Sequence, residues 1–128
     1  MRSRILCISG HPDDARKLSE MLHALPLILD QAGSVREGRA QLQQQAYDAV
    51  LTDATLPDGN WLDVLHLVRE SPRDMAVIVT DPHADMRLWA EVLNLGAHDL
   101  LTQPFDEPEV RRILSNACSR SAASMAAV

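Results

Sequence analysis

The chain has 128 residues, of which 46% are apolar, so its length and composition predict one globular domain around a single core. Its net charge of −6 and its pI near 5.2 argue against direct binding to nucleic acid or to an anionic membrane surface. No apolar stretch is long enough for a membrane span, and no signal peptide is expected before the first strand. Cys7 and Cys118 lack CxxC spacing, so we expect two buried free thiols and a cytoplasmic protein.

Short apolar runs alternate along the chain with stretches whose apolar residues recur at helical spacing. The runs predict strands at residues 5–8, 27–29, 48–53, 75–80 and 100–101. The helical patterns cover residues 13–25, 35–46, 61–68, 86–95 and 110–117. We therefore expect one domain over residues 1–118, followed by a tail, residues 119–128, that is a helix end or the start of a linker.

Capping residues support several of these helix boundaries. Ser34 and Glu37 have the spacing of a capping box, and Asn60 can cap the helix that follows it. Gly96 stands in the usual position of a C-terminal helix cap. These boundaries leave little sequence for loops, as expected for strands and helices that alternate in one compact domain.

The predicted strands are apolar on both faces, which is typical of a parallel sheet that helices cover on both sides. Right-handed crossovers then give a doubly wound α/β fold. In such folds ligands bind beyond the carboxyl ends of the strands. The polar or small residues that follow these strand ends should therefore share one rim, and they are Ser9, Gly10, His11, Asp53, Thr80, Asp81 and Gln103.

Three segments, in order along the chain, resemble the receiver domain of two-component response regulators. They are residues 47–59, which contain Asp53 at the end of a buried strand, residues 77–80, and residues 96–105, which include Gln103. The resemblance covers almost the whole chain and implies a flavodoxin-like sheet with strand order 2-1-3-4-5. It also implies phosphoryl transfer from a phosphohistidine to Asp53. In this family Mg²⁺, held by the phosphoacceptor and an acidic pair, and a lysine neutralise the phosphoryl group.

The chain departs from the family at the residues that would neutralise the phosphoryl group. Ser9 and Gly10 stand at the positions of the acidic pair, and they offer a metal one hydroxyl and no charge. Gln103 puts a neutral amide in place of the lysine, and Asp81 puts a carboxylate where the family has a small residue. Residues 13–14 are expected to open the first helix as N-cap and first-turn acids. The sequence therefore predicts no metal, no cofactor and no catalytic residue.

Two classes of function compete for such a domain. The first, which we favour, is a non-enzymatic, degenerate receiver that dimerises or docks on a protein partner or an attached output domain. The second is a working phosphoacceptor that a histidine kinase or a phosphotransfer protein modifies on Asp53. A small-ligand site at the same rim is a third reading.

Charged side chains mark a candidate interaction surface. In the family this surface is formed by the fourth helix, the fifth strand and the fifth helix. The matching residues, which solvated surface charge explains equally well, are Arg87, Glu91, Asp99, Arg111 and Arg112.

Overall fold

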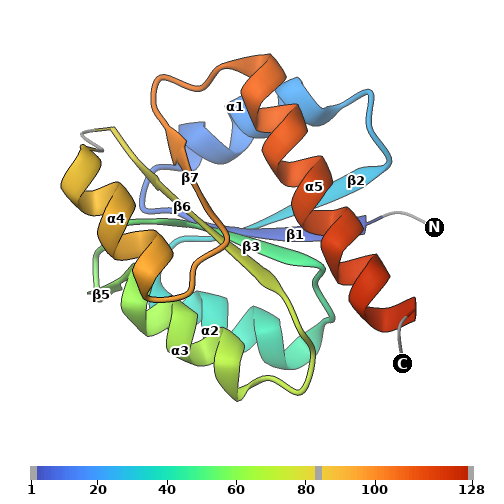
Figure 1. Cartoon of the computed structure of the whole chain (residues 1–128), viewed down its shortest axis with the longest axis horizontal. Coiled ribbons are helices and arrows are strands. Elements are labelled where there is room, and N and C mark those ends of the chain that lie inside the picture. Colours follow the sequence, from blue (N-terminus) through green and yellow to red (C-terminus); the bar gives the residue numbers. More distant parts are fainter. Residues whose placement is uncertain (1–2, 83–84, 127–128) are drawn as a thin grey trace.

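The structure, a computed structural model, describes residues 3–82 and 85–126, with side chains described as far as residue 119. Within these residues, five parallel strands form one sheet in the order β2-β1-β3-β6-β7, and helices cover both of its faces (Figure 1). The strands are β1 (Ser3–Ile8), β2 (Leu27–Ala32), β3 (Ala49–Asp53), β6 (Ala76–Asp81) and β7 (Asp99–Thr102). The helices are α1 (Pro12–Leu22), α2 (Val35–Gln44), α3 (Trp61–Glu70), α4 (Met86–Asn94) and α5 (Glu107–Ala126). Because β6 and β7 are the predicted fourth and fifth strands, the order 2-1-3-4-5 and the doubly wound fold are confirmed.

The strands are apolar on both faces because each face of the sheet is covered by its own helices. α1 and α5 pack on one face, together with the alternate β1 residues Ile5 and Cys7. α2, α3 and α4 cover the other face, toward which Leu6 and Ile8 point. If β1 slipped by one residue, Ile5 and Cys7 would exchange layers with Leu6 and Ile8. The apolar layers on the two faces of the sheet therefore fix the strand register. That register also fixes which strand ends lie level with one another.

Side chains cap the N-termini of α2 and α3. Ser34 Oγ accepts from the Glu37 N–H (3.1 Å) before α2, and Asn60 and Asp63 form a complete capping box at the start of α3. The box predicted at Ser34 is only half formed, because the Glu37 carboxylate instead accepts from the Gly33 N–H (2.6 Å). The predicted starts of both helices are nevertheless confirmed.

The loop after β3 contains a hairpin that the sequence did not predict. β4 (Thr55–Leu56) and β5 (Gly59–Asn60) pair antiparallel at its base. Between them, the carboxylate of Asp58 accepts from the N–H groups of Val35 (2.8 Å) and Arg36 (3.1 Å) at the start of α2. These bonds lower the pKa of Asp58 and give the α2 N-terminus an acceptor. Pro57 and Gly59 are typical of a loop, but they do not indicate the distant helix that this loop contacts.

The start of α1 differs from the prediction, and the end of α5 corresponds to one of the two forms predicted for the tail. α1 begins at Pro12 with His11 as its N-cap residue, so Asp13 and Asp14 both lie in the first turn and neither is the cap. α5 continues to Ala126 and takes in most of the expected tail, of which residues 127 and 128 lie outside the described residues. Among the described helices, none has the length and apolar character needed to cross a membrane.

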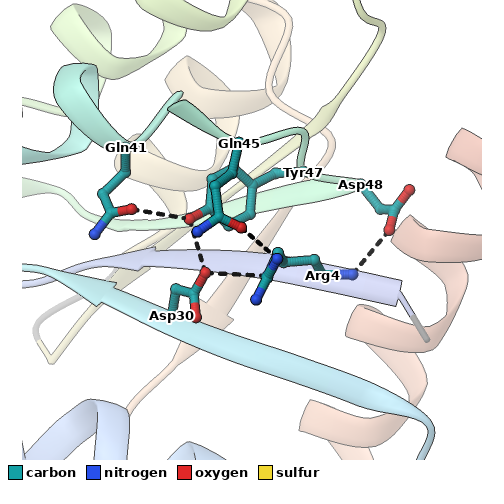
Figure 2. A network of polar contacts seen from close by, with 6 residues as sticks. All are labelled: Arg4, Asp30, Gln41, Gln45, Tyr47 and Asp48. Carbon is teal, nitrogen blue, oxygen red and sulfur yellow. Dashed lines mark hydrogen bonds and ion pairs between the residues drawn. The ribbon is translucent and has the colours of Figure 1, made fainter. Parts of the chain in front are cut away.

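A polar network joins β1, β2 and α2 toward the amino ends of the strands (Figure 2). Arg4 pairs with Asp30 of the edge strand β2 (Nε to Oδ2, 3.1 Å) and contacts Gln45, the C-cap residue of α2. The hydroxyl of the buried Tyr47 donates to Asp30 Oδ2 (2.8 Å), and burial together with this bond raises the pKa of Tyr47 to about 12. The Arg4 N–H donates to Asp48 Oδ2 (2.8 Å). The network ties the edge strand β2 to β1 and lies away from the carboxyl ends.

The two cysteines are buried and free, as predicted from their spacing. Both lie in the core layer beneath α1 and α5. Burial raises the pKa of the Cys7 thiol to about 12 and that of the Cys118 thiol to about 11. Both groups are therefore protonated and unreactive near neutral pH.

Candidate functional site

The carboxyl ends of β1, β3, β6 and β7 lie side by side because these parallel strands pair in register. Asp53 pairs with Thr80, and Asp81 pairs with Thr102, the residue before Gln103. Ser9 follows β1 directly, and the backbone then enters α1. The structure places at or next to this rim the residues that the strand-end rule selected, namely Ser9, Gly10, His11, Asp53, Thr80, Asp81 and Gln103.

Asp53 is buried, with 7% of its surface exposed, and the β1–α1 loop holds its carboxylate. The Ser9 hydroxyl donates to Asp53 Oδ2 (2.9 Å), and the Gly10 N–H donates to the same oxygen (3.2 Å). Ser9 Oγ also accepts from the His11 N–H (3.0 Å), which closes the loop into a small turn. The other carboxylate oxygen, Oδ1, is buried and has no hydrogen-bond partner among the described residues.

Burial raises the pKa of Asp53, because the charged carboxylate loses the stabilisation of water. The hydrogen bonds from Ser9 and Gly10 lower this pKa, the charge of Asp14 raises it, and the charge of His11 lowers it. From the sequence, Asp14 had a role only in the helix start. Its electrostatic influence on Asp53 depends on how α1 packs on the sheet, which the local sequence pattern does not reveal.

On the other side of Asp53, a neutral amide meets a hydroxyl. Gln103 Nε2 donates to Thr80 Oγ1 (3.3 Å), and Thr80 is buried with 3% of its surface exposed. Asp81 is half-buried at the end of β6. The Thr80 hydroxyl therefore already has a protein partner, and the position after β7 supplies no positive charge.

The residues around Asp53 do not fit a magnesium site. Mg²⁺ takes an octahedral set of oxygen ligands, usually with at least one or two carboxylates. Within residues 3–82 and 85–126, no group of three or more His, Cys, Asp or Glu side chains could hold a metal ion. Ser9 and Gly10 direct hydrogens, rather than charged oxygens, at the Asp53 carboxylate. The donor set at this rim is that of a hydrogen-bonded carboxylate.

Cavities lie near both ends of the strands. One of about 570 Å³ lies beside Tyr47 and the ends of α2 and α3, away from Asp53. Another, of about 370 Å³, adjoins the rim and is lined by residues that include Lys17, Met21, Gln103 and Phe105. Its lining mixes a cation, the acid Asp14, an amide and apolar groups, so it does not single out a ligand class.

The predicted interface charges lie on α4, β7 and α5, and they are Arg87, Glu91, Asp99, Arg111 and Arg112. Two of them have partners within the chain. Asp99 Oδ1 accepts from the Leu100 N–H (2.7 Å), and Arg111 pairs with Glu107 one turn earlier in α5 (3.9 Å). Exposed charges of this kind contribute little binding energy by themselves.

The sequence did not predict how much apolar surface α4 exposes. Of its apolar residues only Val92 is fully buried, whereas Met86, Trp89 and Leu93 are 90%, 47% and 42% exposed. These three residues are spaced three and four positions apart, so they share one side of the helix. We call them the α4 apolar face. An exposed patch of large apolar side chains is typical of an interaction site.

Sequence comparison finds a family match and similar curated proteins. The profile described as "Response regulator receiver domain" matches residues 5–115. The response regulator protein PilR of Pseudomonas aeruginosa is 28% identical over 116 residues, which cover 91% of this chain and 26% of PilR. The photosynthetic apparatus regulatory protein RegA of Cereibacter sphaeroides is 30% identical over 110 residues, which cover 86% of this chain and 60% of RegA. The chain thus spans about a quarter of PilR and less than two thirds of RegA.

Solved structures share the fold. The signal receiver domain of a putative LuxO repressor protein from Vibrio parahaemolyticus superposes with a TM-score of 0.91 at 18% identity, covering 99% of this chain and 98% of that chain. The receiver domain of the sensor histidine kinase PA1611 from Pseudomonas aeruginosa has a TM-score of 0.80 at 23% identity, covering 93% and 99%. That structure contains a magnesium ion in its active-site cleft. At these identities the likeness extends to the fold alone.

Proposed function

The chain belongs to the response regulator receiver domain family of two-component signalling. Within this family, we propose that it signals without phosphorylation of Asp53. In this proposal it is a non-enzymatic module that dimerises or docks on a partner protein or an attached output domain. The observation that carries the proposal is the set of groups near Asp53. Ser9 and Gly10 reach its carboxylate with neutral donors, and Gln103 supplies a neutral amide at the position of the family's lysine.

Electrostatics supports this proposal. Phosphoryl transfer depends mainly on positioning and on groups that neutralise the charge of the phosphoryl oxygens. Here the negative charge of Asp14 raises the pKa of Asp53 instead of neutralising its carboxylate, and Asp81 adds another acid to the rim. Removing one well-placed donor from an active site slows catalysis by about a hundredfold or more. The loss of the acidic pair and of the lysine is therefore expected to make phosphorylation negligible.

The α4 apolar face supports a function in binding other proteins. It lies on the part of the fold that relatives use for contacts, and it is apolar where the neighbouring positions Arg87 and Glu91 are charged. Interface centres are enriched in Trp and Met, while charged residues lie at their rims. Because the chain matches only part of PilR and RegA, an output domain in the same polypeptide is one candidate partner and a second copy is the other.

A working phosphoacceptor is the second candidate function, with a histidine kinase or a phosphotransfer protein as the donor. One observation favours it. Asp53 is present at the end of β3, and its Oδ1 atom carries no hydrogen bond within the described residues that would compete with a phosphoryl group. The same atom is buried, however, and burial favours the protonated carboxyl over the nucleophilic carboxylate.

Phosphorylation with acetyl phosphate and Mg²⁺, followed by intact-protein mass spectrometry, tests the proposal. We expect the wild-type chain to remain unmodified. We expect the variant Ser9→Asp/Gly10→Asp/Gln103→Lys to gain a phosphoryl group, because it restores the charges that the family uses. The same triple variant with Asp53→Ala is the matched control and should lose the label. Stoichiometric, Mg²⁺-dependent labelling of the wild-type chain on Asp53 would instead establish the phosphoacceptor function.

A further inference from the structure

We propose that Asp53 is a structural anchor of the β1–α1 loop, and that Ser9 and Gly10 hold its carboxylate in place of a metal ion. This proposal rests on the proposed function and gives Asp53 a role that does not involve a phosphoryl group. It concerns one cluster, which we call the Asp53 clasp and define as the Asp53 carboxylate, the Ser9 hydroxyl and the Gly10 N–H.

The clasp joins two segments that are distant in sequence. Asp53 ends β3, whereas Ser9 and Gly10 form the connection between β1 and α1, and both donors meet the same oxygen, Asp53 Oδ2. Ser9 also accepts from the His11 N–H (3.0 Å), and His11 is the N-cap residue of α1. A single carboxylate oxygen thereby fixes the loop and, through Ser9, the entry into α1.

Burial strengthens these bonds. Ser9 is 1% exposed and Asp53 is 7% exposed, so bulk water competes little for the donors or for the acceptor. Hydrogen bonds to an ionised acceptor are stronger than neutral ones, and a low local dielectric strengthens them further. If the carboxylate were removed, the buried Ser9 hydroxyl would lose its charged partner.

The same geometry disfavours a cation at this oxygen. Two hydrogens already point at Oδ2, and positions 9 and 10 contribute no carboxylate that could complete a metal site. Steric crowding is not the reason that position 10 lacks an acid. A Cβ atom on Gly10 would lie 3.5 Å from Pro57 Cδ, which is ordinary van der Waals contact. The residues at positions 9 and 10 therefore decide between a clasp and a metal site.

Thermal unfolding with and without Mg²⁺ tests whether these positions exclude the metal. We expect about 10 mM Mg²⁺ to leave the Tm of the wild-type chain unchanged. The same concentration should raise the Tm of Ser9→Asp/Gly10→Asp by at least about 2 °C, because a ligand that binds the folded state stabilises it. Gly10→Asp alone is the second variant, since it leaves the buried Ser9 in place. A Mg²⁺-dependent rise in the wild-type Tm would overturn the proposal, as would the absence of any rise in both variants.

Amide hydrogen exchange tests the anchor itself. Asp53→Ala removes the acceptor, so the Gly10 N–H should exchange at least about tenfold faster, while Asp53→Asn keeps an acceptor oxygen and should stay close to wild type. Ser9→Ala leaves the Asp53 carboxylate intact, so it should speed exchange at His11, whose N–H loses its acceptor, more than at Gly10. Equal exchange at Gly10 in the wild-type chain and Asp53→Ala would overturn the proposal.

These outcomes are separate from the test of the proposed function. A wild-type chain that binds Mg²⁺ but takes up no phosphoryl group would contradict the clasp and leave the proposed function intact. A chain that shows no metal binding and protected Gly10 exchange, but that a kinase phosphorylates, would contradict the proposed function and leave the clasp intact.

Discussion

Burial and hydrogen bonding act on the Asp53 carboxylate in opposite directions, and burial has the larger effect on its pKa. Ser9 and Gly10 satisfy one oxygen, while the other is buried without a partner among the described residues. The ionised group is thus only partly compensated for the water that it loses on folding. Its negative charge is therefore a destabilising feature of the folded domain near neutral pH.

This balance predicts how Asp53→Asn changes stability with pH. Because the pKa of Asp53 is raised in the folded state, its contribution to stability is fully present below the unfolded value of 3.8 and is lost as the pH rises through the folded value. The Asn side chain keeps an acceptor for Ser9 and Gly10 but cannot ionise. We expect the variant to be more stable than the wild-type chain at pH 7, by about 1 kcal/mol.

Urea unfolding of both proteins at a series of pH values from about 3 to about 7 measures this effect. The difference in the free energy of unfolding between Asp53→Asn and the wild-type chain should grow as the pH rises through this window. A constant difference would show that burial does not raise the pKa of Asp53. Asp58→Asn is the opposite control, because the pKa of exposed Asp58 is lowered by the Val35 and Arg36 N–H groups.

At the scale of single residues, the sequence predicted which side chains meet at the rim but not how they bond. The rim follows from a general rule about strand ends in doubly wound sheets, so Asp53, Thr80 and Gln103 could be placed together in advance. The bond from Gln103 to Thr80 and the influence of Asp14 on Asp53 depend on side-chain rotamers and on the packing of α1. Neither property is encoded in a local pattern.

Among the elements, the C-terminal end of α4 depends on one glycine. Gly96 has φ +103°, a backbone conformation that residues with a Cβ atom rarely adopt. Beside it, Arg69 of α3 donates from Nη2 to the Leu95 carbonyl (2.6 Å), which satisfies a carbonyl at the helix end. A Cβ atom at position 96 would collide with this guanidinium group. The glycine and the arginine together set the angle at which the chain leaves α4.

We therefore expect Gly96→Ala to lower the free energy of unfolding by at least about 1 kcal/mol, from backbone strain and from the displaced Arg69. Gly10→Ala is the matched glycine control. Its φ is not in the positive region and its Cβ has room, so it should change stability by less than about 0.5 kcal/mol. Urea unfolding followed by circular dichroism measures both. Equal effects of the two substitutions would contradict this account of Gly96.

Elements whose ends carry their own chemical signal were predictable, and the others were not. Asn60 caps α3 and Gly96 ends α4 as the sequence indicated, because a cap acts within one turn of its residue. The hairpin of β4 and β5 was not predictable because its two short strands carry no apolar pattern. Asp58 instead fixes it to the start of a helix that is distant in sequence. The sequence left residues 119–128 open between a helix end and a linker, because they are small residues without helical periodicity, and α5 continues through them to Ala126.

For the whole molecule, the two layers of helices bury the central strands of the sheet but leave α4 only partly covered. α4 packs inward through Val92 and the half-buried Leu88, and its other side exposes Met86, Trp89 and Leu93. Periodicity could not reveal this, because the six large apolar residues of the predicted helix form two stripes and only one layer of core is available to them. The fold was thus predictable as a whole. Predicting the α4 apolar face would have required knowing which of the two apolar stripes of α4 packs against the core.

This geometry predicts that the wild-type chain self-associates through the α4 apolar face, and that Trp89→Lys/Leu93→Lys abolishes the association. Burying Trp89 against a second copy removes a large apolar side chain from water, whereas a lysine there leaves an unpaired charge in the interface. Light scattering over a dilution series should give a dimer mass for the wild-type chain at high concentration and a monomer mass for the double variant. Ser19→Lys, at an exposed site on α1, is the control for a lysine introduced away from the α4 apolar face and should remain dimeric. Charge reversal at Asp99 or Arg112 should weaken the dimer by less, since exposed ion pairs contribute about 0–1 kcal/mol. A wild-type chain that stays monomeric, or a double variant that still dimerises, would assign the α4 apolar face to a different partner.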